Sequence, residues 1–217
     1  MNQVFTLTAH PLTVADLTAR FGPMPLSRFR FSPFPGTATE EDVVRLRERE
    51  RRLYELVDGI LVEKTMGFAE SMVAGVLIQI LRNWLEQHPL GVVAGEGGMM
   101  RLAPGLVRIP DVSFVRWEQF PNRKVTLEPV PDLHPDLAIE VLSLSNTAEE
   151  MARKLHDFFT SGAKLVWYVD PRGRTVTVYT APDQSTVLRE DQTLDGGAVL
   201  PGFALPLRQL FAELETQ

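Results

Sequence analysis

The sequence predicts a mixed α/β fold, in which helices flank a sheet of mixed strand direction. Apolar residues recur at three- and four-residue spacing over about 68–87 and 147–161, which is typical of helices that bury one face. Short β-rich runs appear at 53–57, 60–64, 91–95, 99–102, 107–115, 136–142, 164–170 and 175–180. Helices and strands do not alternate regularly along the chain, so we do not expect a doubly wound fold.

Residues 1–38 are expected to form an N-terminal appendage, and residues 39–217 the main domain. Only 11–20 in the appendage has the loose amphipathic pattern of a short helix, and prolines interrupt the stretch that follows. Thr39 is a suitable N-cap for a helix that runs to about Glu50, because three acidic residues occupy its first turn.

The next two elements have clear boundaries. Asp58-Gly59 joins two β-rich runs and is a strong two-residue turn signal, which predicts a hairpin over 53–64. The amphipathic helix over 68–87 is expected to end before Pro89 and Gly91.

The segment that begins at 136 has the pattern of a buried central strand followed by a helix. After Asp136, every residue of the run DLAIEVL (136–142) is apolar except Glu140, which is typical of a strand covered on both faces. Thr147 and Glu150 have the spacing of a capping box, and Gly162 is expected to end this helix. The polar residues 118–135 are expected to form a loop.

Composition excludes several classes of protein. The chain of 217 residues is 44% hydrophobic and 23% charged, as expected for a soluble globular domain with a sizeable core. The absence of cysteine excludes disulfides, thiolate chemistry and the usual structural zinc sites. No apolar run approaches the roughly 20 residues that span a membrane. The N-terminus also lacks a secretory signal, so we expect a cytoplasmic protein.

The net charge of -6 argues against a protein that grips nucleic acid mainly by bulk charge. One segment is nevertheless basic, and its arginines are Arg45, Arg47, Arg49, Arg51 and Arg52. The pattern fits either a solvated helix face or a face that contacts phosphates.

Three charged residues could carry chemistry. Glu140 lies in a buried strand, where a charge is costly unless it is paired or binds a metal, although it could simply reach solvent at the strand end. Asp111 follows a proline, which is also a common strand entry. Lys154 lies at the border of the buried helix stripe, and it could instead form a surface ion pair with Glu150, four residues before it.

Four segments together resemble a known family. They are YELVDGILVE (54–63), RIPDVSFV (108–115), PDLAIEVLSLS (135–145) and KLHDFFTSGAKLVWYVDP (154–171). In this order and spacing they are similar to the Uma-two (Uma2) family of putative restriction endonucleases, in the PD-(D/E)XK nuclease superfamily. The resemblance covers roughly residues 40–180 and implies a restriction-endonuclease-like fold.

The resemblance also implies roles for individual residues. Asp111 and Glu140 would be metal-binding carboxylates, with the backbone carbonyl of Val141 as a further ligand. The lysine usually found two residues after the Glu is replaced here by Leu142, and Lys154 from the next helix would take its catalytic place. Glu70 is a weaker candidate ligand, because related sequences tend to have histidine there.

The resemblance therefore implies a DNA endonuclease that uses Mg²⁺, or Mn²⁺, and acts as a homodimer. Mg²⁺ prefers hard oxygen ligands and commonly binds through one or two carboxylates. Two alternatives stay open at this point. One is a catalytically inactive module that keeps the fold to bind nucleic acid or a protein partner, and the other is a metal-dependent hydrolase with a different substrate.

Overall fold

The computed structural model describes residues 12–212 and 214. Within them lie the helices α1 (Val14–Phe21), α2 (Glu40–Glu50), α3 (Phe68–Gln87), α4 (Ala148–Ser161) and α5 (Leu207–Ala212). A first sheet has the order β1-β3-β2-β6-β5, with β1 (Phe29–Arg30), β3 (Ile60–Glu63), β2 (Tyr54–Val57), β6 (Leu106–Arg108) and β5 (Met100–Ala103).

A second, six-stranded sheet has the order β11-β10-β9-β8-β7-β4. Its strands are β11 (Gln184–Arg189), β10 (Thr175–Ala181), β9 (Leu165–Asp170), β8 (Leu137–Val141), β7 (Val112–Arg116) and β4 (Gly91–Gly95). A two-stranded ribbon, β12 (Thr193–Gly196) and β13 (Leu200–Pro206), precedes α5. In the six-stranded sheet β8 and β9 are parallel and the other neighbours antiparallel, so the predicted mixed α/β architecture is confirmed.

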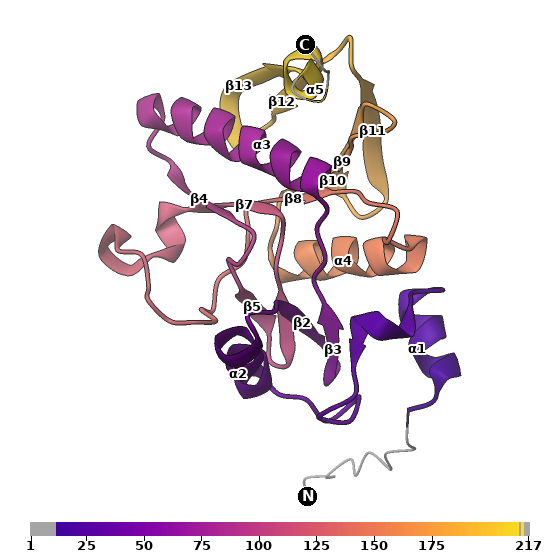
Figure 1. The fold of residues 1–217 in the computed structure, drawn as a ribbon. Helices are drawn as coiled ribbons and strands as arrows, with labels where there is room; N and C mark the ends of the chain where they lie inside the picture. The colour runs from indigo at the N-terminus through magenta and orange to yellow at the C-terminus, as the bar shows by residue number, and fades with distance from the viewer. Residues whose placement is uncertain (1–11, 213, 215–217) are drawn as a thin grey trace, which may run out of the picture.

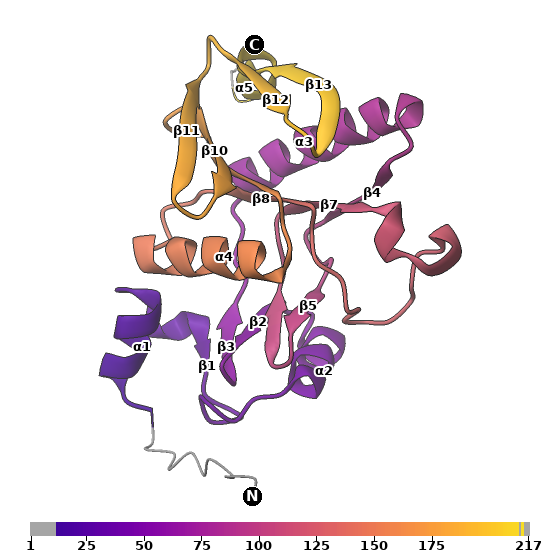
Figure 2. The same cartoon turned by 180° about the vertical axis from the view of Figure 1, so that it is seen from behind.

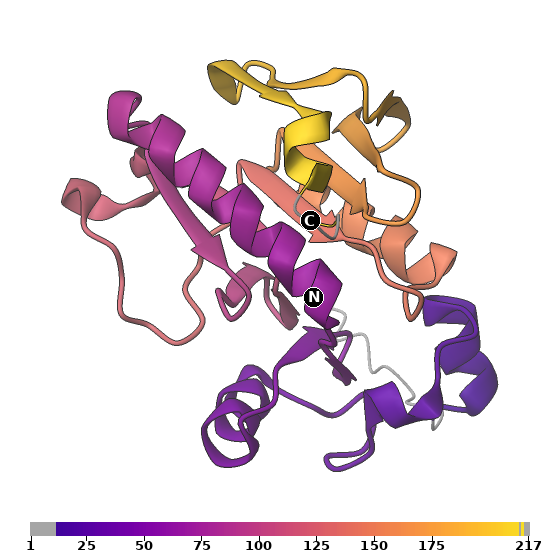
Figure 3. The same cartoon turned by 45° about the horizontal axis from the view of Figure 1, so that its top comes forward.

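The helices form layers around the second sheet. The long α3 crosses one face of this sheet, and the β12–β13 ribbon and α5 lie on the same side (Figures 1 and 3). The other face is covered by α4, which lies between the second sheet and the first sheet (Figure 2). The two sheets and α4 therefore meet at one junction, and the candidate site lies there.

The prediction of one continuous strand over 107–115 is wrong, because this segment forms two strands. Its first part is β6 in the first sheet and its second part is β7 in the second sheet, with Ile109–Asp111 between them. Pro110 has no backbone N–H to donate to a ladder, which suits a point where the chain leaves one sheet for the other. This crossing places Asp111 at the junction of the sheets.

The alternation along β8 decides where Glu140 points. Leu137, Ile139 and Val141 belong to the large core beneath α3, whereas Ala138 packs in the cluster beneath α4. Because side chains alternate along a strand, Glu140 lies on the α4 face with Ala138. The contact between Glu140 and Lys154 of α4 agrees with this orientation.

The expected boundary at residue 38 does not coincide with a packing boundary. In the described part of the expected appendage, β1 pairs with β3, and Phe21 and Phe29 pack against the hairpin core. Arg28 also makes a buried two-bond ion pair with Glu150 of α4, at 3.0 and 2.9 Å. Residues 12–38 are therefore part of the domain's packing, while 1–11 lie outside the described residues.

The other predicted elements are confirmed with small shifts of boundary. Asp58 and Gly59 both have positive φ, as the two-residue turn requires. The Thr147 side chain caps α4, but the predicted capping box is only half formed, because the Glu150 carboxylate pairs with Arg28. The strands β11 and β12 were not predicted, because β11 is mostly exposed and has no apolar alternation. Among the described residues, no helix is both long and apolar enough to cross a membrane.

Candidate active site

Asp111 and Glu140 lie side by side at the junction of the two sheets. Antiparallel pairing of β7 with β8 brings Val112 opposite Ile139. Asp111, which precedes Val112, therefore lies next to Glu140, which follows Ile139. The backbone N–H of Val141 donates to Asp111 Oδ2 at 2.6 Å, which fixes the orientation of this carboxylate. Each of the two side chains is about 4% exposed.

Lys64 lies between these two carboxylates. Its Nζ is 2.7 Å from Asp111 Oδ1 and 2.9 Å from Glu140 Oε2. Burial would lower the pKa of this lysine, but the charges of Glu140 and Asp111 raise its pKa far above the usual value. Sequence reasoning missed Lys64, because its position after β3 does not reveal which strand of the second sheet lies opposite.

Lys154 reaches Glu140 from the opposite side, from the buried face of α4. Its Nζ is 3.2 Å from each oxygen of Glu140 and 3.3 Å from Glu55 Oε1. The alternative interpretation, a surface ion pair with Glu150, is wrong: Lys154 is buried, and Glu150 pairs with Arg28. The Lys154 side chain therefore extends from α4 to the end of β8.

A second layer of charges holds Lys154 in place. Glu55 accepts hydrogen bonds from Arg108 at 2.8 Å and from the Ile109 backbone N–H at 3.1 Å. Arg108 also binds Asp157 at 2.5 Å. Burial would raise the pKa of Glu55, but Lys154 and Arg108 beside it lower this pKa to about 2. Glu55 is thus ionised at neutral pH and orients the lysine.

Glu140 behaves differently from Glu55. Burial raises the pKa of Glu140, and the negative charges of Asp111 and Glu55 raise it further. Lys154 and Lys64 oppose this shift without cancelling it. Burial is the largest of these causes, so the raised pKa of Glu140 reflects mainly the cost of ionising a carboxyl group away from water.

Glu96 is an exposed acidic residue whose charge interacts with those of the site. It follows β4 in a turn that contains Gly95, Gly97 and Gly98. Partial burial and the charge of Asp111 raise the pKa of Glu96, while Lys64 lowers it, so the carboxylate is near both groups. No motif in the sequence singled out this acidic residue.

The two remaining predicted ligands are not part of these contacts. Glu70 lies in the first turn of α3, and a Cβ added at Gly67 would be 2.2 Å from its Oε2, so its carboxylate folds over the start of its own helix. Among the described residues, no hydrogen bond or ion pair joins Glu70 to Asp111 or Glu140. The roles of Glu70 and of the Val141 carbonyl stay predictions.

The donor set fits a small hard cation. Asp111 and Glu140 each direct one carboxylate oxygen at the same ammonium nitrogen, so their oxygens already converge on one positive charge. The described residues include no cluster of three or more His, Cys, Asp or Glu side chains suited to a metal. A metal held here would use the two carboxylates and keep several waters, as Mg²⁺ commonly does.

Comparison with known proteins identifies the family. The model of the Uma2 family, described as a putative restriction endonuclease, matches residues 40–208. The chain belongs to the Uma2 family. The predicted resemblance is confirmed, and the match includes every residue of the site from Glu55 to Asp157, whereas the first 39 residues lie outside it.

A solved structure shows the same fold as this Uma2 protein. It is the crystal structure of a putative nuclease belonging to DUF820 from Anabaena variabilis, with a TM-score of 0.71 and 20% sequence identity. The alignment covers 82% of this chain and 99% of that chain. The predicted restriction-endonuclease-like fold is thereby confirmed. A search of curated proteins found no match.

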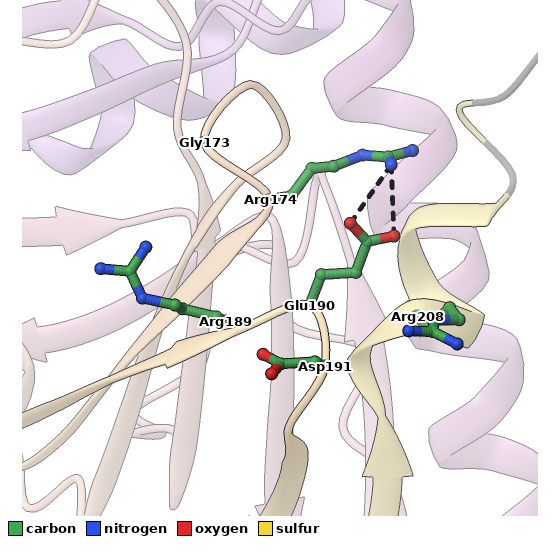
Figure 4. Close-up of a pocket in the computed structure, with 6 residues that line it drawn as sticks. All are labelled: Gly173, Arg174, Arg189, Glu190, Asp191 and Arg208. Atoms are coloured by element: carbon green, nitrogen blue, oxygen red, sulfur yellow. Dashed lines mark hydrogen bonds and ion pairs between the residues drawn. The ribbon is translucent and has the colours of Figure 1, made fainter.

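A surface hollow elsewhere on this Uma2 protein has different chemistry. It has a volume of about 440 Å³ and lies between the β9–β10 turn, the end of β11 with the residues that follow it, and α5 (Figure 4). Arg174 and Glu190 pair with each other across it, as the dashed lines show. None of the motif residues lines this hollow, so its size does not make it the candidate active site.

Proposed function

We propose that this protein is a Mg²⁺- or Mn²⁺-dependent DNA endonuclease that hydrolyses phosphodiester bonds. One observation carries the proposal: the carboxylates of Asp111 and Glu140 converge on a single cationic position, and the Lys154 ammonium lies directly beside it. Membership of a family of putative restriction endonucleases makes DNA the expected substrate.

Each residue then has a distinct task. Asp111, oriented by the Val141 N–H, and Glu140 would hold the metal, with the Val141 carbonyl as a further ligand. When bound, the metal would polarise a phosphoryl oxygen and lower the pKa of a bound water. Lys154 supplies positive charge where negative charge develops in the transition state. Glu55 and Arg108 keep the lysine directed at the end of β8.

The arginines of α2 suggest how DNA would reach the site. Arg47 is exposed and makes no ion pair among the described residues, whereas Arg45 pairs with Asp42 and Arg52 with Glu63. A Cβ added at Gly97, beside Glu96, would lie 3.9 Å from Arg47 Nη2. Arg47 therefore lies beside the turn that carries Glu96, and we expect it to contact a DNA phosphate there despite the negative net charge of the protein.

The proposed assembly is a homodimer, in which each protomer cuts one strand. This expectation rests on the fold, since many enzymes of the restriction-endonuclease type act in this way. Light scattering of the full chain, with and without DNA, would test it.

The decisive experiment is plasmid nicking with Mg²⁺ or Mn²⁺. Asp111→Asn and Glu140→Gln remove the metal-binding charges without a large change in shape, and both should abolish cleavage. Lys164→Met is the matched control, because Lys164 is an exposed lysine at the other end of β8, paired with Asp136. Cleavage that persists in both carboxylate variants would overturn the proposed site.

A second function is favoured by one observation. Because Lys64 already neutralises part of the charge on Asp111 and Glu140, the same site could be a structural ion-pair cluster in a catalytically inactive module. Such a module would bind nucleic acid or a protein partner. It predicts DNA binding without cleavage under any metal condition, together with no saturable binding of Mn²⁺.

A further inference from the structure

We propose that the Lys64 ammonium is an internal substitute for the metal: it occupies the cation position between Asp111 and Glu140, and it must withdraw before a divalent cation binds. This inference rests on the proposed metal site. If Lys64 competes with the metal for the same two carboxylates, it lowers the affinity of the protein for a divalent cation.

The contacts identify Lys64, and not Lys154, as the competitor. Lys64 is the lysine whose Nζ contacts both Asp111 and Glu140, at 2.7 and 2.9 Å. Lys154 contacts Glu140 and Glu55, and its ion pairs do not include Asp111. A cation shared by the two carboxylates would therefore collide with the Lys64 ammonium and leave Lys154 in place.

The charges of the buried cluster support the exchange. The cluster consists of four carboxylates and three cations: Glu55, Asp111, Glu140, Asp157, Lys64, Arg108 and Lys154. Among these buried groups, withdrawal of Lys64 leaves four negative charges against two positive ones, a net charge of -2 that one divalent cation neutralises. The partly exposed Arg153 also pairs with Asp157 at the outer edge of the cluster, at 3.4 Å. With Lys64 and a metal both inside, the cluster would carry excess positive charge in a buried place.

The position of Lys64 allows it to leave while its backbone stays in place. Its backbone N–H donates to the Leu53 carbonyl at 2.8 Å, immediately after β3, and Thr65 beside it is exposed. Lysine has a flexible four-carbon stem and a strongly hydrated ammonium group, so the charged end can move toward solvent by side-chain rotation.

The first test measures Mn²⁺ binding to the full chain by calorimetry. Lys64→Met should bind Mn²⁺ at least about tenfold more tightly than the wild type, a difference of about 1.4 kcal/mol. Lys64→Arg keeps the competing charge and should stay close to the wild type, as should the control Lys164→Met. Equal or weaker Mn²⁺ binding by Lys64→Met would overturn the proposal.

The second test needs no variant, and it decides the question if Lys64→Met does not fold. Acetylation of the wild-type protein is followed by mass spectrometry, with and without saturating Mn²⁺. Labelling of Lys64 should rise severalfold with Mn²⁺, while Lys154 stays protected and exposed Lys164 stays reactive. Unchanged labelling of Lys64 at saturating Mn²⁺ would show that the lysine does not withdraw.

The outcomes separate this inference from the proposed function. Saturable Mn²⁺ binding that Asp111→Asn abolishes, with no effect of Lys64→Met, would overturn the role of Lys64 and leave the metal site intact. No Mn²⁺ binding by either the wild type or Lys64→Met would overturn both.

Discussion

Replacement of Lys154 by methionine tests whether a helix-borne lysine does the chemistry of this site. The substitution keeps most of the side-chain volume and removes only the charge. We expect a folded protein that has lost its nicking activity, since Lys154 is the ammonium held beside Glu140 by Glu55. Two separate magnitudes, for stability and for rate, can be worked out from the contacts.

The stability effect follows from the ion-pair distances. At 3.2 Å and an effective dielectric constant of about 20, one pair of unit charges interacts by about 5 kcal/mol, before the desolvation that opposes it. Breaking a buried pair by removing one partner typically costs about 3–5 kcal/mol. Glu140 keeps Lys64 and Glu55 keeps Arg108, so the cost should fall at the lower end of this range.

The catalytic effect should exceed what the stability loss can explain. Loss of one preorganised charge that stabilises a transition state typically lowers the rate by about 10²–10³-fold. Nicking rates are measured at a temperature where circular dichroism shows the variant to be folded, with Lys164→Met as control. A folded Lys154→Met protein that nicks plasmid within about twofold of the wild-type rate would refute the catalytic role.

Three further outcomes are expected. Arg28→Met should lower the free energy of unfolding by about 3 kcal/mol in urea denaturation, because it leaves Glu150 buried and unpaired; an effect below 1 kcal/mol would mean that this segment contributes little to the fold. Arg47→Gln should weaken DNA binding and reduce the magnitude of the salt slope of binding by about one, and an unchanged slope would remove Arg47 from the phosphate contacts. The pKa of Glu55 is lowered from 4.5 to about 2 in the folded protein, so its ionisation stabilises the fold above pH 4.5, and this contribution is lost as the pH falls toward 2. Between pH 5 and 3, Glu55→Gln should therefore lose less unfolding free energy than the wild type, and equal losses in urea titrations would contradict the shifted pKa.

Local structure was predictable wherever the signal is local. The apolar period of α3 and the Pro89 and Gly91 after it predicted the bounds of this helix, and Asp58-Gly59 predicted the hairpin. These signals act between residues a few positions apart, through turn geometry and the burial of one face. The division of 107–115 between two sheets was not predictable in this way, because it depends on which strands meet in space.

The residues of the candidate site also differ in whether the sequence alone could predict them. Glu140 and Lys154 drew attention in the sequence because a charge in a buried strand or at the edge of a buried helix stripe is costly. Asp111, and the roles expected of all three residues, came from the family resemblance. Glu55, Arg108 and Asp157 were not predictable, since each is an ordinary charged residue until its partner is known. For Glu150 the local signal was misleading. The spacing of four residues suggested an ion pair with Lys154, whereas in the structure Glu150 pairs with Arg28.

The sequence by itself therefore determined the helices, most strands, the family and the three residues on which the proposed chemistry depends. Only the tertiary structure decided that Lys154 turns inward and that Lys64 lies between the two carboxylates. The physical reason is that ion pairs act over about 3 Å in space, whereas Lys64 and Glu140 are 76 positions apart in the chain. The packing of the first sheet against α4 and the second sheet brings these charges together.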